Sequence, residues 1–283
     1  MTRSDRRWRP PLAWRAAQVA ARVVVAAVAR LRVTGDVPDA LRGGPLILAA
    51  NHLSPFDPIA LAAACRTRRI APRFLATGGL FRARLLGPVM RHWGHIAVHR
   101  GTAEVVRALP EAVRALAAGS VVLVYPEGRI GLDPHLWPER GRTGVAHLAL
   151  TTNATVVPVA QWGSHEVVPY SAPRGLLRTL PRTIRRRPVV RVHFGAPVSL
   201  DGLRAGVPGH PRRATDRIVA AITRELARLR VDEPGRPHHV DPTRPARPRP
   251  RPHKHRSTGS VEGDAPAPGS GDAQIRPTDA ATG

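Results

Sequence analysis

The sequence predicts an α/β domain whose mixed β-sheet is flanked by helices, with an N-terminal amphipathic helix and a disordered C-terminal tail. Three observations support this prediction: short apolar runs that follow turn residues, helical patterns that alternate with them, and a change of composition near residue 231. Strands alternating with helices are typical of a largely parallel or mixed sheet. The chain has 283 residues, 42% of them hydrophobic, and is long enough to bury a sizeable core.

The first half of the domain is predicted to hold two strands and two helices. Pro45–Ala50 is a short, wholly apolar run after a Gly-Gly turn, which indicates a buried strand. Pro58–Cys65 has the composition of a helix, and Ile70–Leu75 is expected to form a second strand. Val105–Ala118 carries apolar residues along one helical face and is predicted to end at Gly119, a residue common just after helices.

The second half continues the alternation. Ser120–Tyr125 is rich in β-branched residues and is predicted to be another buried strand. A helix is expected over Thr143–Leu150, followed by strands over Thr155–Ala160 and Val189–Phe194. An amphipathic helix over Arg212–Arg230 closes the predicted domain, which therefore covers residues 35–231.

The two ends differ from the domain in composition. Residues 1–34 begin with arginines and then become apolar, but Arg22 interrupts the apolar stretch, so neither a transmembrane helix nor a signal peptide is expected. A basic amphipathic helix in the membrane interface fits this pattern, and a surface helix that caps the domain is the alternative. Residues 232–283 are rich in Pro, Arg and Gly and nearly without apolar residues, which predicts disorder.

The formal net charge is +24, and it lies in the predicted folded part, since residues 1–230 hold 36 arginines against 13 acidic residues. A field of this sign favours an anionic membrane, a phosphate-bearing substrate or nucleic acid. The arginine cluster Arg182–Arg191 would hold anionic lipid beside a membrane, and a solvated face is the alternative. The single cysteine, Cys65, excludes an internal disulfide and a cysteine-based zinc site. Within the arginine cluster, Arg182, Arg185, Arg186 and Arg187 are the residues expected to bind anionic lipid.

The sharpest chemical signal is the segment Asn51–Asp57, NHLSPFD, directly after the first predicted strand. Reactive side chains of α/β proteins commonly lie at the carboxyl ends of strands. A carboxylate bonded to one imidazole nitrogen fixes the tautomer, so Asp57 would make the other nitrogen of His52 a better base. If the substrate supplies the hydroxyl, the pair needs no nucleophilic Ser or Cys. A structural hydrogen bond is the alternative for the pair taken alone.

Three later segments complete a pattern that resembles the 1-acylglycerol-3-phosphate acyltransferases, part of the broad glycerolipid acyltransferase family. The resemblance spans about residues 35–200 and comprises four blocks in the family's order. The first is Asn51, His52 and Asp57; the second is Gly94–Arg100; the third is Pro126, Glu127 and Gly128; the fourth is Val157, Pro158 and Val159, with Gly163 just beyond.

The resemblance implies a glycerol-3-phosphate acyltransferase-like fold and roles for these residues. His52 would deprotonate the acceptor hydroxyl, and Asp57 would support it as the second catalytic residue. The expected substrate-binding residues are Asn51, Arg100, Glu127, Gly128, Arg129 and Arg142. A guanidinium offers forked donors that suit phosphate oxygens.

The third block departs from the family pattern, which continues Gly-Thr-Arg. Here Arg129 follows Gly128 directly and the Thr is missing, so the arginine comes one residue early. Arg142, in a Gly-Arg-Thr-Gly segment, is a second candidate for the phosphate-binding cation. This departure leaves a headgroup other than that of lysophosphatidate as an alternative for the acceptor.

The sequence thus predicts an acyltransferase that moves a fatty acyl group from acyl-CoA or acyl carrier protein to a lysophospholipid, with 1-acyl-sn-glycerol-3-phosphate as the default acceptor. Another lysolipid or a glycolipid is the alternative acceptor. A basic nucleic-acid-binding protein is the alternative of another class, although no nucleic-acid-binding motif is visible and no such partner is expected. No metal or other cofactor is implied. The expected location is peripheral, on the cytoplasmic face of the cell membrane, with the anionic membrane surface as a partner.

Overall fold

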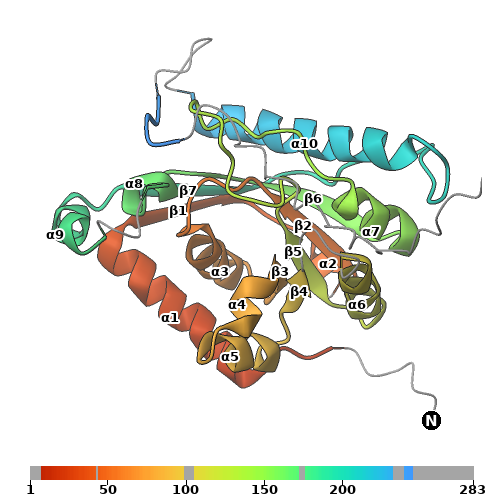
Figure 1. Cartoon of the computed structure of the whole chain (residues 1–283), viewed down its shortest axis with the longest axis horizontal. Helices are drawn as coiled ribbons and strands as arrows, with labels where there is room; N and C mark the ends of the chain where they lie inside the picture. Colours follow the sequence, from red (N-terminus) through yellow and green to blue (C-terminus); the bar gives the residue numbers. More distant parts are fainter. Residues whose placement is uncertain (1–7, 43, 99–104, 172–175, 232–238, 245–283) are drawn as a thin grey trace, which may run out of the picture. The chain divides into compact units, whose positions relative to one another are not determined.

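The computed structural model describes residues 8–42, 44–98, 105–171, 176–231 and 239–244 (Figure 1). Within them one sheet has the strand order β1-β7-β6-β2-β5-β3-β4. Neighbouring strands are parallel except β6 and β7, which are antiparallel, so the predicted mixed sheet is confirmed. The strands are β1 (Arg30–Gly35), β2 (Leu46–Ala50), β3 (Arg73–Thr77), β4 (Ile96–Val98), β5 (Val121–Val124), β6 (Thr155–Trp162) and β7 (Val189–Phe194).

Helices cover both faces of the sheet. Figure 1 shows α1 and α3 on one face and α7 and α10 on the other. The longer helices are α1 (Leu12–Val28), α3 (Asp57–Thr67), α6 (Val105–Ala117), α7 (Gly144–Thr152), α9 (Leu176–Arg186) and α10 (His210–Leu229). The shorter ones are α2 (Asp39–Arg42), α4 (Gly78–Arg82), α5 (Leu86–His92) and α8 (Ser164–Val167).

The centre of the sheet explains why β2 is apolar without alternation. Successive side chains of a strand point to opposite faces, and here both faces are covered. Leu46 and Leu48 belong to the core cluster shared with α1 and α3. Ile47 and Ala49 belong to the cluster shared with α6, α7 and α10. All five residues of β2 are therefore buried.

The predicted boundary at residue 34 is wrong, because α1 and β1 are part of the domain. Trp14, Val25 and Val28 of α1 are buried in the core that contains α3. Arg30 of β1 pairs with Val189 of β7. Strand β1 was not predicted because it is an edge strand with largely exposed side chains, two of which belong to arginines.

The other predicted strands and helices are found with small shifts. The strand expected over Ile70–Leu75 begins and ends later, at Arg73 and Thr77. Strand β4 and the short helices were not predicted, because three to seven residues are too few to show a period. No helix in the described ranges is long and apolar enough to cross a membrane.

The prediction that residues 232–283 are disordered throughout is wrong for residues 239–244, which lie against the domain. The backbone nitrogen of Asp241 donates to the carbonyl oxygen of Pro134 at 2.8 Å. Arg244 is 5% exposed. The segment is held by hydrogen bonds and an ion pair rather than by apolar burial, so hydrophobic patterning did not reveal it.

Candidate active site

The candidate site lies where three neighbouring parallel strands end. Strand β2 pairs with β5 on one side and β6 on the other, with Ala49 opposite Val124 and Ala50 opposite Val159. The carboxyl ends of parallel strands meet at the same edge of a sheet. The residues that follow β2 and β5 are therefore brought together at this edge.

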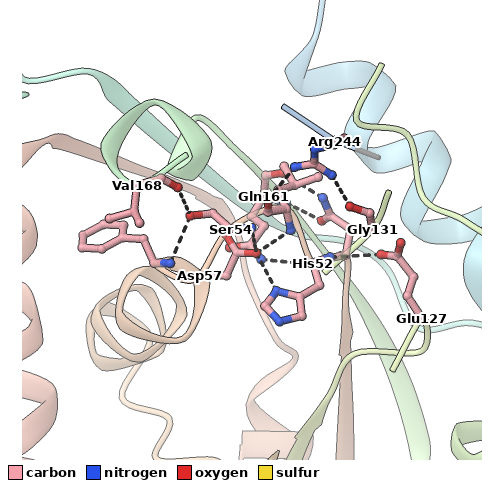
Figure 2. A network of polar contacts seen from close by, with 11 residues as sticks. His52, Ser54, Asp57, Glu127, Gly131, Gln161, Val168 and Arg244 are labelled. Carbon is pink, nitrogen blue, oxygen red and sulfur yellow. Dashed lines mark hydrogen bonds and ion pairs between the residues drawn. The ribbon is translucent and has the colours of Figure 1, made fainter. Parts of the chain in front are cut away.

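His52 and Asp57 form the predicted pair. The Nδ1 atom of His52 lies 2.8 Å from Oδ2 of Asp57 (Figure 2). The same oxygen accepts the backbone N–H groups of Leu53 and Ser54. Asp57 is fully buried at the start of α3, where a negative charge is favoured by the helix dipole. Three donors on one oxygen hold the carboxylate in a single orientation toward the imidazole.

The imidazole of His52 is also fixed from one face. Its ring stacks on the ring of Tyr125, with the centroids 4.0 Å apart and an angle of 14° between the planes. The His52 side chain is 14% exposed. Burial raises the pKa of Tyr125 well above its usual value, so its phenol is neutral at physiological pH. Nδ1 faces Asp57, which leaves Nε2 as the nitrogen that can exchange a proton with a ligand.

Glu127 supports the backbone of the site and does not face the solvent. Its Oε1 accepts the backbone N–H of His52 at 3.0 Å, and its Oε2 accepts that of Glu139 at 3.1 Å. Burial raises the pKa of Glu127 to about 7, although both hydrogen bonds act to lower it. Glu127 was predicted to bind substrate, and in the structure both of its carboxylate oxygens accept backbone N–H groups of the protein.

Asn51, also expected to bind substrate, is 1% exposed and joins β2 to β6. Its Nδ2 donates to the carbonyl oxygen of Gln161 at 3.0 Å, and its Oδ1 accepts the backbone N–H of Gln161 at 2.9 Å. The Nε2 of Gln161 donates to the carbonyl oxygen of Asn51 at 2.6 Å. These three bonds extend the pairing of the two strands by one residue and hold His52 at the sheet edge.

The two arginine candidates of the third block have different surroundings. Arg129 is paired with Glu139, with Nη2 and Oε2 3.1 Å apart, and its side chain is 38% exposed. Arg142 is exposed, and its aliphatic stem lies over Gly128. Gly128 has a φ of +70°, and a Cβ there would lie 2.9 Å from Cδ of Arg142. The positive φ of the turn therefore favours glycine, and a larger residue would also displace the Arg142 side chain.

Arg100, the remaining predicted substrate-binding residue, lies outside the described residues. The structure adds residues that were not predicted from the sequence. Tyr125 and Gln161 stand at the carboxyl ends of strands, so their position relative to His52 could have indicated them. Arg244 offered no such signal. Among the described residues, no group of three or more His, Cys, Asp or Glu side chains could hold a metal ion.

Comparison with known proteins gives concordant results. The family model described as Acyltransferase matches residues 30–162. An uncharacterised protein of Mycobacterium leprae is 33% identical over 150 residues, which cover 50% of this chain and 38% of that protein. An uncharacterised protein of Mycobacterium tuberculosis is 32% identical over 150 residues, covering 50% of this chain and 39% of that one. The chain thus matches less than half of the length of these relatives.

The fold is similar to that of a solved acyltransferase. The crystal structure of PlsC, the 1-acyl-sn-glycerophosphate acyltransferase of Thermotoga maritima, superposes with a TM-score of 0.57 at 19% sequence identity. The alignment covers 77% of this chain and 79% of that one. The matched region, residues 30–162, includes His52, Asp57 and Glu127. The match to the Acyltransferase model identifies residues 30–162 as an acyltransferase domain, in agreement with the resemblance of the motifs.

Proposed function

We propose that this protein transfers a fatty acyl group from an acyl thioester to the hydroxyl of a lysophospholipid, with 1-acyl-sn-glycerol-3-phosphate as the first acceptor to test. The observation that carries the proposal is the pairing of His52 with a fully buried Asp57 at the carboxyl end of β2. A histidine oriented by a carboxylate, with its other nitrogen available, is the general base that an alcohol nucleophile needs.

The reaction follows from this arrangement. Nε2 of His52 removes the proton from the acceptor hydroxyl as its oxygen attacks the thioester carbonyl carbon. The carbon–sulfur bond breaks, an ester forms, and the imidazolium returns the proton to the departing thiolate. Asp57 stabilises the imidazolium between these two transfers. Acyl-CoA and acyl carrier protein remain alternative donors, because both present the same thioester.

Arg142 is proposed to bind the acceptor's phosphate. It is exposed, extends from the loop that follows β5, and lies over Gly128 beside the Glu127 that contacts His52. Arg129 is a weaker candidate because Glu139 already neutralises its charge. A forked guanidinium suits a phosphate, so a phosphorylated acceptor fits this edge of the sheet.

The direct test is acyl transfer from a labelled acyl-CoA to lysophosphatidate by the purified protein in detergent, compared with His52→Ala. His147→Ala is the matched control, because His147 is an exposed histidine of α7. We expect transfer by the wild type and the control, and a loss of at least about 100-fold with His52→Ala. Transfer that survives in His52→Ala would contradict the mechanism. If the wild type transfers to neither lysophosphatidate nor other lysolipids, from either donor, the proposed reaction is wrong.

The acceptor's lipid nature leads to a second proposal, that the protein binds an anionic membrane through α1 and α9. One face of α1 packs in the core, whereas Leu12, Val19 and Val23 are exposed on the other. A cavity of about 390 Å³ beside α1 and β1 is lined by arginines and by no acidic residue. Exposed apolar side chains with flanking arginines favour binding at the lipid interface. The lining arginines are Arg22, Arg30, Arg68 and Arg187.

Liposome co-sedimentation tests this second proposal. A variant with Arg182, Arg185 and Arg186 changed to Gln should bind anionic liposomes more weakly than the wild type, most clearly at low salt. The matched control changes three exposed arginines of α10, Arg213, Arg224 and Arg228, to Gln and alters the net charge equally. Equal weakening by both variants would show that only net charge matters, and unchanged binding by the first would remove the role of α9.

A further inference from the structure

A single buried guanidinium connects the C-terminal segment to the turn that carries His52. Nη2 of Arg244 donates to the carbonyl oxygen of Leu53 at 2.6 Å, and Nη1 donates to the carbonyl oxygen of Gly131 (Figure 2). Leu53 follows His52 directly, and Gly131 belongs to the loop after β5. The Arg244 side chain is 1% exposed, so the guanidinium is shielded from solvent at these carbonyls.

The two carbonyls belong to segments that also hold the backbone of His52. The backbone nitrogen of Gly131 donates to the carbonyl oxygen of His52 at 2.8 Å. The backbone nitrogen of His52 donates to Glu127 at 3.0 Å. Arg244 therefore closes a ring of hydrogen bonds that runs from His52 through Gly131 and the guanidinium to Leu53. The backbone nitrogen of Leu53 in turn donates to Oδ2 of Asp57.

Arg244 is itself held in place by its neighbours. Its Nε lies 3.1 Å from Oδ2 of Asp241, whose side chain is 11% exposed. The guanidinium also lies 5.5 Å from the ring centroid of Tyr170. Asp241 is anchored to Pro134 by a backbone hydrogen bond. A side chain fixed at both ends presents its donors at constant positions, which a flexible surface arginine does not.

We propose that Arg244 is a positioning residue for the His52–Asp57 pair, so that residues 239–244 complete the active site of the acyltransferase. Arg244 lies outside residues 30–162, which match the family model, so the family motifs do not include it. The inference rests on the proposed function of His52. It goes further by assigning to the C-terminal segment the orientation of the peptide between His52 and Leu53, and through it the imidazole–carboxylate contact.

Kinetics of Arg244→Met test the positioning role in the full-length chain. Methionine keeps much of the stem's apolar volume but donates to neither carbonyl. We expect kcat to fall by about 10- to 100-fold, as small displacements of catalytic groups commonly cause, with KM within about threefold of the wild type. Arg217→Met is the matched control, because its guanidinium also donates to two backbone carbonyls, those of Ser199 and Asp201, outside the site. We expect its kcat to be unchanged.

Proton NMR of the His52 ring tests the positioning role of Arg244 without any substrate. The ring proton on Nδ1 of His52, bonded to a buried carboxylate, should give a downfield proton resonance that His52→Gln removes and thereby assigns. Arg244→Met should shift or broaden that resonance, whereas Arg217→Met should leave it in place. If the protein transfers no acyl group, this resonance still decides whether Arg244 orients His52, so failure of the two proposals can be told apart.

The remaining outcomes are also decisive. If Arg244→Met does not fold, Arg244→Lys replaces it, since lysine keeps the charge but cannot reach both carbonyls in a forked geometry. For Arg244→Lys we expect a kcat below that of the wild type but above that of a variant without a cation, and a displaced His52 resonance. Added guanidinium should restore part of the activity of any folded variant that lacks the arginine. Wild-type kcat and an unmoved resonance in Arg244→Met, or in Arg244→Lys where only that variant folds, would overturn it.

Discussion

The carboxylate of Glu127 lies 3.0 Å from the backbone nitrogen of His52 and joins the turn after β5 to the turn after β2. The second oxygen of the same carboxylate holds the backbone nitrogen of Glu139. The loop between residues 127 and 139 is thus tied at both ends to one buried side chain. Glu127 of the Pro-Glu-Gly block therefore holds the backbone of His52, in addition to any contact that its loop makes with the acceptor.

Replacing Glu127 by Gln should change how stability depends on pH. Burial raises the pKa of Glu127 from 4.5 to about 7, so between these values the folded state keeps a proton that the unfolded state releases. The contribution of Glu127 to the free energy of unfolding is therefore greatest below pH 4.5. It falls by at most about 3 kcal/mol as the pH rises to about 7. Urea unfolding at pH 5 and pH 8 should show a smaller fall in Glu127→Gln than in the wild type. Equal falls would contradict the raised pKa.

Asp57→Asn should remove most of the catalytic activity while leaving the fold in place. The amide oxygen of asparagine can still accept the hydrogen bonds that Oδ2 receives from His52, Leu53 and Ser54, but a neutral amide does not stabilise the imidazolium that forms during transfer. We expect kcat to fall by about 10²- to 10⁴-fold, as for a base that loses its orienting carboxylate. Steady-state kinetics with a thermal melt check this, and Asp201→Asn in an exposed loop is the control. A kcat within about threefold of the wild type would show that Asp57 does not support the base.

Arg142→Ala should raise KM for a phosphorylated acceptor more than Arg129→Ala does. Loss of a charge-assisted hydrogen bond costs about 1.5–3 kcal/mol, which corresponds to about 10- to 100-fold in KM. Arg129 is already paired with Glu139, so its removal should cost less. The internal control is 1-monoacylglycerol, which lacks the phosphate and should respond to neither substitution. An equal rise of KM for both acceptors with Arg142→Ala would exclude a phosphate contact.

His165 should make the protein sensitive to acid. It is 6% exposed, and its ring packs against those of Trp162 and His239. Burial lowers the pKa of His165 to about 3, so below pH 6.5 the unfolded state takes up a proton that the folded state excludes. The loss of stability grows as the pH falls from 6.5 toward 3 and reaches about 2 kcal/mol at pH 5.

Denaturant unfolding at pH 7 and pH 5 tests this assignment. His165→Phe should flatten the decline, because phenylalanine takes up no proton. The control is His147→Phe, which changes an exposed histidine of α7 and should retain the wild-type slope. A wild-type slope in His165→Phe would mean that another group causes the acid sensitivity.

Much of the fold and part of the site could be predicted from the sequence. The central strands are short apolar runs because they are covered on both faces. The contact between His52 and Asp57 could be predicted because both residues lie in one local turn. The edge strand β1 was not predicted because its alternation of two arginines with Leu31 and Val33 is short and continues the basic, apolar N-terminal segment. The backbone contacts of Asn51 and Glu127 could not be predicted, since a motif records residue types but not whether their polar atoms face the protein or the ligand.

By itself, the sequence determined the alternation of strands and helices, the four motifs and the proposal of His52 as the base, because each of these depends on neighbouring residues or on the periodicity of one segment. Only the tertiary structure decided that Glu127 holds His52, that Glu139 neutralises Arg129, and that Arg244 reaches the carbonyl of Leu53. These contacts join segments up to 191 residues apart. No local pattern encodes them, because they form only when parallel strands bring their carboxyl ends to one edge of the sheet and the C-terminal segment packs beside it.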